Sequence, residues 1–119
     1  MNGSVKVVSA LLAAGVHVDY TDRRGTAALH DASKMGHDSV VSLLLDHGAN
    51  INIKQRYGWT PLLIAAGNGH ESLVSLLLTR GADYNLRDNN GNTAIDFANR
   101  FDHPEAATII EEFIRKVMQ

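Results

Sequence analysis

The chain has 119 residues, of which 45% are hydrophobic and 20% are charged, which is typical of one folded domain and argues against disorder. The formal net charge of −2 at pH 7 argues against a nucleic-acid-binding protein that works through overall positive charge. Because the chain has no cysteine, it has no disulfide framework and no thiolate metal site, which is compatible with an intracellular location, cytoplasmic or nuclear. No apolar run approaches the roughly 18 residues that span a membrane, so we expect no membrane insertion.

The predicted elements start with a helix inside residues 1–24. Its apolar side chains recur at helical spacing and are Val7, Val8, Leu11 and Leu12. Residues 29–35 predict a short helix that ends at Gly36, because a residue without a Cβ atom readily takes the left-handed conformation. A second short helix is predicted over 39–46, where valine and leucine recur at helical spacing, and Gly48 ends it.

This order of elements repeats along the chain. Gly25, Gly58 and Gly91 are 33 residues apart, and residues 25–57 are identical to residues 58–90 at 14 of 33 positions. Helices of about two turns do not persist alone in water, whereas stacked units that share one core are stable together. We therefore expect a single repeat domain. Its predicted units are a half repeat over 1–24, full repeats over 25–57 and 58–90, and a C-terminal capping repeat over 91–119.

The last unit and the two ends carry further signals. The turn Asn89-Asn90-Gly91 is expected to use the tolerance of asparagine and glycine for positive φ. Pro104 suits the first turn of a final helix with charged residues, as in a capping repeat. At the N-terminus the half repeat leaves an apolar end uncovered. We expect either further repeats of a longer protein, which we favour, or association with another chain there, self-association included.

The sequence Gly58-Trp59-Thr60-Pro61-Leu62 resembles the G-x-T-P-L-H signature of the ankyrin repeat family, and Gly81-Ala82-Asp83 resembles a later landmark of the same repeat. This resemblance implies an all-α repeat solenoid of helix-turn-helix units joined by β-turn or hairpin loops, with about three and a half repeats. The chain departs from the family pattern where Leu63 and Asp96 replace histidine and where Ala27-Ala28 replaces Thr-Pro. We expect these departures to weaken hydrogen bonding between units without changing the fold.

The histidines are the main candidates for chemistry. His37, His70 and His103 are the same position of successive repeats, so they are separated by about 10 Å, the spacing of packed helices. One metal ion bound at about 2 Å cannot join them, and we expect each to make a turn-stabilising hydrogen bond. His30 is expected to bond to a neighbouring loop. The serines and glycines form no nucleophile elbow or phosphate-binding loop, so we expect no catalytic residue, no metal and no cofactor.

In ankyrin-like proteins, ligands contact the turn tips and the exposed side of the first helix of each repeat, which together form a concave face. Carried over to this chain, those positions and the linking residues before the turns, Lys54 among them, include seven of its 11 basic residues and its only tryptophan. The alternative is that Trp59 lies against the neighbouring turn and that the basic residues form a solvated surface. The candidate partner-binding residues are Arg23, Arg24, Lys34, Met35, Arg56, Tyr57, Trp59, Asn68, Arg87, Asn90, Asn92, Arg100 and Phe101.

These features predict a non-enzymatic protein–protein interaction module, a scaffold or adaptor, that binds a segment of another protein. Arginine binds carboxylate and phosphate groups in a bidentate manner, so the segment is expected to be acidic or phosphorylated. One alternative is binding of a nucleotide or single-stranded RNA, with Trp59 or Tyr57 stacked on a base. Another is a purely architectural role in a longer repeat array.

Overall fold

A computed structural model describes residues 9–10, 12–15, 17–23 and 25–118 of the chain. Val7, Val8 and Leu11 of the expected first helix lie outside these residues, whereas Leu12 is described and helical. No helix of the described part is both long and apolar enough to cross a membrane. The labelled helices are α2 (Ala28–Met35), α3 (Asp38–Asp46), α4 (Pro61–Gly67), α5 (Glu71–Thr79), α6 (Ala94–Arg100) and α7 (Pro104–Val117).

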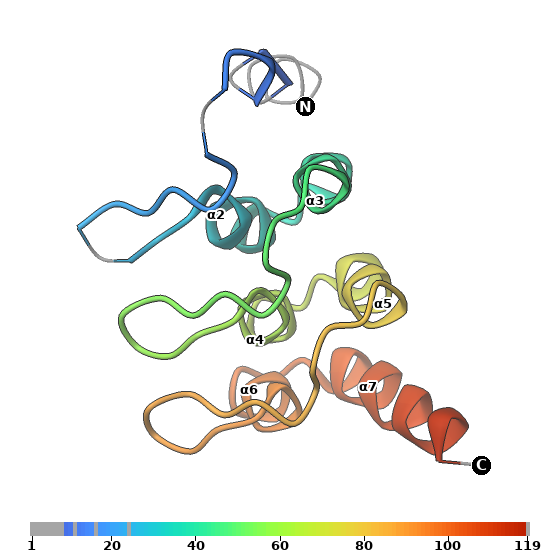
Figure 1. Ribbon diagram of the computed structural model, residues 1–119. Coiled ribbons are helices and arrows are strands. Elements are labelled where there is room, and N and C mark those ends of the chain that lie inside the picture. Colours follow the sequence, from blue (N-terminus) through green and yellow to red (C-terminus); the bar gives the residue numbers. More distant parts are fainter. Residues whose placement is uncertain (1–8, 11, 16, 24, 119) are drawn as a thin grey trace.

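The helices form two layers that stack along one direction. Helices α2, α4 and α6 lie side by side in one layer, α3, α5 and α7 lie in the other, and long turns project from the first layer (Figure 1). The molecule measures 41 Å along its longest axis and 26 and 25 Å across. This arrangement confirms the predicted all-α repeat solenoid.

Two helices of the first layer, α4 and α6, begin at a threonine that satisfies a free backbone N–H group. The Thr60 hydroxyl accepts a hydrogen bond from the Leu63 N–H at 3.3 Å, and the Thr93 hydroxyl accepts one from the Asp96 N–H at 3.4 Å. The Asp96 carboxylate in turn accepts a hydrogen bond from the Thr93 N–H at 2.9 Å, which completes a capping box. Asp96, one of the departures from the family pattern, therefore stabilises the start of α6.

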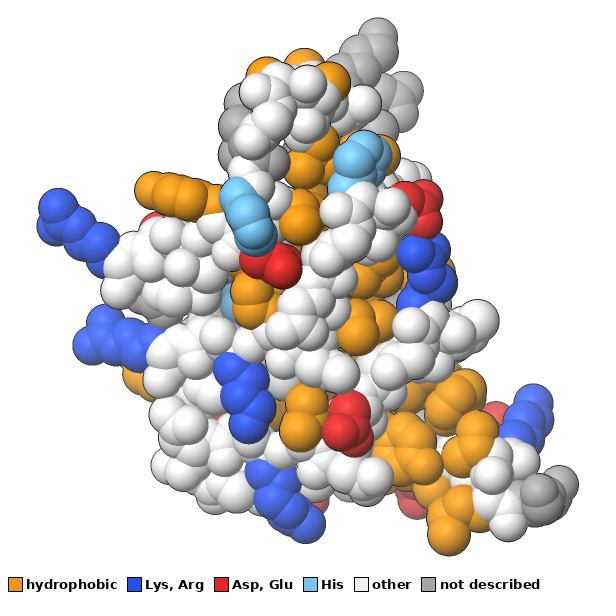
Figure 2. Space-filling model, in the orientation of Figure 1, with side chains coloured by type: hydrophobic (Ala, Val, Ile, Leu, Met, Phe, Trp, Pro, Cys, Tyr) orange, Lys and Arg blue, Asp and Glu red, His pale blue; other side chains and the backbone are white. Residues whose placement is uncertain are grey.

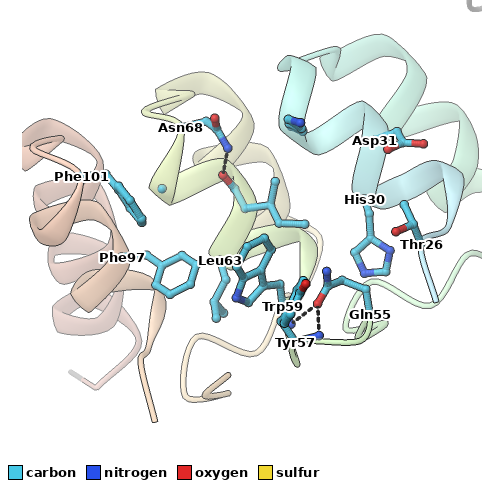
Figure 3. A pocket seen from close by; sticks show the side chains of 13 residues that line it. Thr26, His30, Asp31, Gln55, Tyr57, Trp59, Leu63, Asn68, Phe97 and Phe101 are labelled. Atoms are coloured by element: carbon cyan, nitrogen blue, oxygen red, sulfur yellow. Dashed lines mark hydrogen bonds between the residues drawn. The ribbon is translucent and has the colours of Figure 1, made fainter. Parts of the chain in front are cut away.

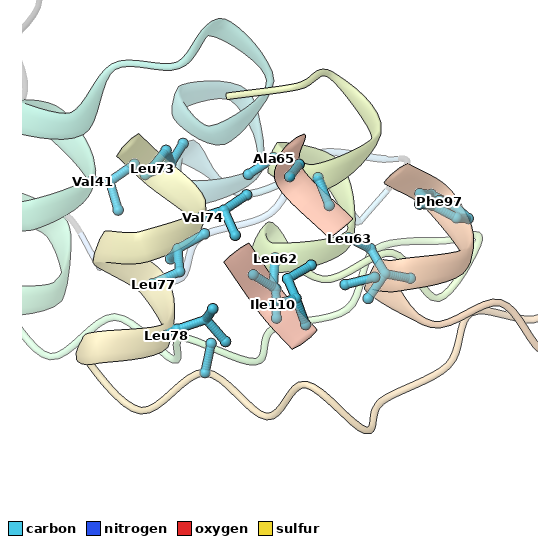
Figure 4. Packing of buried hydrophobic residues seen from close by; sticks show 14 of the residues in the cluster. Val41, Leu62, Leu63, Ala65, Leu73, Val74, Leu77, Leu78, Phe97 and Ile110 are labelled. Carbon is cyan, nitrogen blue, oxygen red and sulfur yellow. The ribbon is translucent and has the colours of Figure 1, made fainter. Parts of the chain in front are cut away.

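The core lies between the two layers and is made mainly of leucine and alanine. Leu63 of α4 and Val74 and Leu77 of α5 are fully buried members of this core (Figure 4). The repeat-equivalent Ala65 and Ala98 are also fully buried, and their small side chains let α4 and α6 approach closely. Because neighbouring units supply this core jointly, the stability of each helix depends on the next unit.

The turns between units share one construction. The Gly58 N–H donates to the Gln55 carbonyl at 2.9 Å, and the Gly91 N–H donates to the Asp88 carbonyl at 3.0 Å. Gly91 has a φ of 84°, in line with the expected turn chemistry, whereas neither asparagine before it has a positive φ. Asn89 instead bonds to the preceding turn: its N–H donates to the Tyr57 carbonyl and its side-chain amide to the Arg56 carbonyl, both at 3.0 Å.

Candidate binding surface on the turn side

A pocket of about 440 Å³ opens on the side of α2, α4 and α6 from which the turns project (Figure 3). We call this side the concave face. One wall of the pocket is polar and comes from α2 and the turn before it. The opposite wall is aromatic and comes from α6 and the turn before α4. The pocket is lined by Thr26, His30, Asp31, Lys34, Gln55, Tyr57, Trp59, Leu63, Ile64, Gly67, Asn68, Phe97 and Phe101.

The aromatic wall is a continuous row of four rings. The ring centroids of Tyr57 and Trp59 are 5.2 Å apart, and those of Trp59 and Phe97 are 5.9 Å apart. Phe97 lies on α6 and Phe101 directly after its end, and their ring centroids are 5.8 Å apart. At the two ends of the row, Tyr57 and Phe101 remain 51% and 53% exposed, so both rings are available to a partner.

Trp59 is held by the neighbouring turn. It is half-buried, and its side chain makes a hydrogen bond with the Asp88 side chain in the turn before α6. The Asp88 carboxylate also accepts bonds from the Asn90 and Asn92 N–H groups, each at 2.9 Å. Burial raises the pKa of Asp88, but these hydrogen bonds outweigh it and hold the pKa below its ordinary value of 3.8. Trp59 therefore lies against the neighbouring turn, which was the alternative to a role in partner contact. It also lines the pocket.

Gln55 shapes the turn that carries Tyr57 and Trp59. Its side-chain oxygen accepts bonds from the Tyr57 N–H at 2.5 Å and from the Trp59 N–H at 3.2 Å. Gln55 stands at the repeat position of Asp22 and Asp88, and the Asp22 carboxylate accepts an equivalent bond from the Thr26 N–H at 3.0 Å. The side-chain amide of Gln55 thus holds the backbone at Tyr57 and Trp59, the two residues of this turn whose rings line the pocket.

The polar wall contains one fully engaged histidine. His30 is 2% exposed, its Nδ1 accepts from the Ala27 N–H at 2.9 Å, and its Nε2 lies 2.9 Å from the Ile53 carbonyl oxygen. Burial lowers the pKa of His30 below its ordinary value of 6.5, although hydrogen bonding and the nearby carboxylates oppose this. A neutral ring with a proton on Nε2 satisfies both bonds. The expected bond from His30 to a neighbouring loop is confirmed.

Asp31 and Lys34 are the charged groups of the polar wall. Both side chains are exposed, they lie one turn apart on α2, and no ion pair joins them within the described residues. The Lys34 carbonyl, by contrast, is occupied, because His70 Nε2 lies 2.8 Å from it. This bond confirms the expected structural role for His70 and links α2 to the turn before α5. No cluster of three or more potential metal ligands occurs in the described part of the chain.

The structure brings only some of the predicted residues together. Asn68 lines the pocket, but its side-chain amide bonds to the Ile64 carbonyl at 2.8 Å. The predicted residues that line the pocket are Lys34, Tyr57, Trp59, Asn68 and Phe101. Those described outside it are Arg23, Met35, Arg56, Arg87, Asn90, Asn92 and Arg100. Arg24 lies outside the described residues.

Lys and Arg side chains project along the edge formed by the turns (Figure 2). Some of them support this edge as well: Lys54 donates to the Arg87 carbonyl at 3.2 Å, and the Arg87 guanidinium donates to the Gly91 carbonyl at 2.6 Å. Arg56 lies over the Tyr57 ring, 5.7 Å from its centroid. Arg56 is therefore a basic group held next to the open end of the aromatic row.

Sequence reasoning missed Phe97, which joins Trp59 to Phe101 in the aromatic row. Phe97 could have been predicted from the sequence, because it is four residues from the candidate Phe101 and residues with that spacing share one face of a helix. Gln55 was also missed. Its position, shared with Asp22 and Asp88 in the repeat, could have identified it as a turn-shaping residue.

The repeat architecture has a counterpart among known families. A family model described as ankyrin repeats (many copies) matches residues 29–78 and 69–109. The two matches overlap and together run from α2 into α7. No curated protein was found to match the chain.

Proposed function

Because this chain belongs to the ankyrin repeat family, whose members are generally protein–protein interaction modules and typically non-enzymatic, we propose that it binds a segment of another protein on its concave face. The observation that carries the proposal is the pocket beside two exposed aromatic side chains. Tyr57 and Phe101 stand at opposite ends of the aromatic row, and both line the pocket. Aromatic residues next to a concavity are the groups that most often dominate binding energy at protein interfaces.

The charge around the pocket favours an acidic segment. Lys34 lines the pocket, and Arg56 is held beside Tyr57 at one end of the aromatic row. Arg100, at the end of α6, is also exposed. These groups would attract carboxylates and speed association, and the contribution would weaken with salt, since screening at about 0.15 M acts beyond roughly 8 Å.

The geometry around Trp59 disfavours the nucleotide and RNA alternative. Base stacking needs an open aromatic face, whereas Trp59 packs between Tyr57 and Phe97 and bonds to Asp88. A purely architectural role stays as the alternative, and it predicts that changes on the concave face leave every interaction intact.

The test is an affinity capture from cell lysate that compares the unchanged chain with a Tyr57→Ala, Phe101→Ala double variant. These two residues are preferred to Trp59 because their rings are exposed, so their removal leaves the Trp59–Asp88 bond in place. Val117→Ala is the matched control: Val117 is 51% exposed and lies on α7, in the other helix layer.

We expect at least one protein that is retained by the unchanged chain and by the control and is lost from the double variant, with all three equally folded by circular dichroism. Identical captured proteins for all three would contradict binding at the concave face and would favour the architectural role.

A further inference from the structure

The residue at the end of α4 lacks a side chain where the equivalent residues of the neighbouring units have long ones. Lys34, Gly67 and Arg100 are the same position of successive repeats, at or next to the ends of α2, α4 and α6. Gly67 has no left-handed φ, so its backbone does not require glycine. The reason for glycine at this position is therefore space.

That space adjoins the pocket and the aromatic row. A Cβ atom on Gly67 would lie 3.2 Å from the Phe97 ring and 3.5 Å from the Phe101 ring, and Gly67 itself lines the pocket. A lysine or arginine here would cover the groove between α2 and α6. With no side chain at Gly67, the pocket stays unfilled here, above the buried Leu63 and Ile64 of α4.

We infer that Gly67 is a specificity-determining residue, which leaves room for one large apolar side chain of the partner segment beside the aromatic row. This inference rests on the proposed function and deepens it. The occupant is a protein segment that carries a phenylalanine, leucine or methionine for the pocket and an aspartate or glutamate close to it. The carboxylate meets Lys34, the only cationic side chain that lines the pocket in the described part of the chain.

A carboxylate fits this arrangement better than a phosphate. A phosphate group carries about two negative charges and is usually bound by several converging basic groups. Here the pocket has a single lysine, and the Asp31 carboxylate lies one helical turn from it. A dianion at Lys34 would be repelled by Asp31 more strongly than a single carboxylate would be.

The test is selection from a displayed library of random 12-residue peptides, with the full chain as bait. The unchanged chain is expected to enrich peptides that share one large apolar residue with an acidic residue at a fixed distance from it. Gly67→Leu fills the pocket and is expected to remove the apolar preference. Lys34→Glu is expected to keep the apolar residue and to exchange the acidic one for lysine or arginine.

Two controls separate these effects from general ones. Ser75→Leu adds the same apolar side chain at an exposed position of α5, and Lys116→Glu reverses a charge on α7. Both are expected to select the same peptides as the unchanged chain. Gly67→Ala, a smaller change, keeps the inference testable if Gly67→Leu does not fold, and should weaken binding of a selected peptide about tenfold.

The outcomes distinguish the two proposals. If the unchanged chain enriches nothing, the proposed function and this inference both fail. If enrichment is lost in the Tyr57→Ala, Phe101→Ala variant but the Gly67 and Lys34 variants select unchanged sequences, the proposed function stands and this inference is wrong. A selected peptide that binds more tightly when its acidic residue is replaced by phosphoserine would overturn the choice of carboxylate.

Discussion

The His70 ring occupies the place where a side chain of Gly36 would lie: a Cβ atom on Gly36 would be 2.8 Å from Nδ1 of His70, while Nε2 of the same ring lies 2.8 Å from the Lys34 carbonyl oxygen. The contact joins the end of α2 to the start of α5. Gly69 and His103 repeat the close approach one unit later, where the distance is 2.5 Å.

Gly36→Ala should therefore destabilise the protein more than Gly48→Ala does. Both glycines have positive φ, 71° and 89°, so each variant loses about 1 kcal/mol from backbone strain. Nothing lies within 4 Å of a Cβ atom at Gly48, whereas at Gly36 the His70 ring must move, which we expect to cost a further 1 to 3 kcal/mol, roughly. Urea denaturation measures both. Equal losses would refute the steric role of His70, and a His70→Ala background should remove most of the difference.

Asp102→Gly should stabilise the protein. Asp102 stands at the repeat position of Gly36 and Gly69 and has a φ of 64°, a conformation that glycine adopts with least strain. We expect a gain of about 0.5 to 1 kcal/mol in the free energy of unfolding, partly offset by the greater freedom of glycine in the unfolded chain. Asp102→Ala is the opposing variant and should lower stability. A thermal shift of the same sign for both would show that the left-handed backbone is not the cause.

The lowered pKa of His30 predicts that acid destabilises the fold. The unfolded chain binds a proton at His30 below its ordinary pKa of 6.5, while the folded protein keeps the ring neutral until a lower pH. The contribution of His30 to stability is thus present above pH 6.5 and is lost as the pH falls through the folded pKa. His30→Leu, which copies the buried Leu63 of the next unit, should reduce the loss of unfolding free energy between pH 7 and 5. Parallel pH profiles would contradict this.

Asp88 also predicts a loss of stability in acid, at lower pH than His30. For Asp88 the folded protein favours the charged form, whereas for His30 it favours the neutral form. The pKa of Asp88 is lowered, so its contribution to stability is present above its ordinary value of 3.8 and is lost as the pH falls through the folded pKa. At pH 7, Asp88→Ala should cost about 1 to 3 kcal/mol, because it leaves the Asn90 and Asn92 N–H groups and the Trp59 side chain without their acceptor. Fluorescence of Trp59 during urea unfolding measures the loss. A variant as stable as the unchanged chain would show that water replaces the carboxylate.

The helices were predictable because the repeat presents each signal several times. The expected helix over 29–35 corresponds to α2, and the one over 39–46 to α3, each within one residue at its start. Gly36 takes the predicted left-handed conformation at the end of α2. These features depend on local backbone chemistry and on helical spacing, both of which are visible in one unit.

Contacts between units were harder to predict, because they depend on which side chains meet after stacking. The sequence places Trp59 at a turn but does not show that Asp88, in the next turn, binds its side chain. Likewise, the sequence marks Asn89 and Asn90 as turn residues, but it does not show that Asn89 bonds to the preceding turn, at Arg56 and Tyr57. Leu63 stands where the family pattern has a histidine that would bond to the next loop. Between these units, other bonds are made, such as that from the Lys54 side chain to the Arg87 carbonyl.

Gln55 has a consequence for how the pocket responds to its surroundings. Asp22 and Asp88 hold their turns with carboxylates, and that of Asp88 loses its charge in acid, but the amide of Gln55 does not titrate. The turn that carries Tyr57 and Trp59 therefore keeps its hydrogen bonds under acidic conditions that weaken the turn of Asp88. Gln55 itself adds no negative charge to this turn, whereas Asp88, in the next turn, places a carboxylate beside the Trp59 side chain. In the middle unit, the backbone of the turn is thus held independently of proton concentration, whereas the bond from Asp88 to the Trp59 side chain is not.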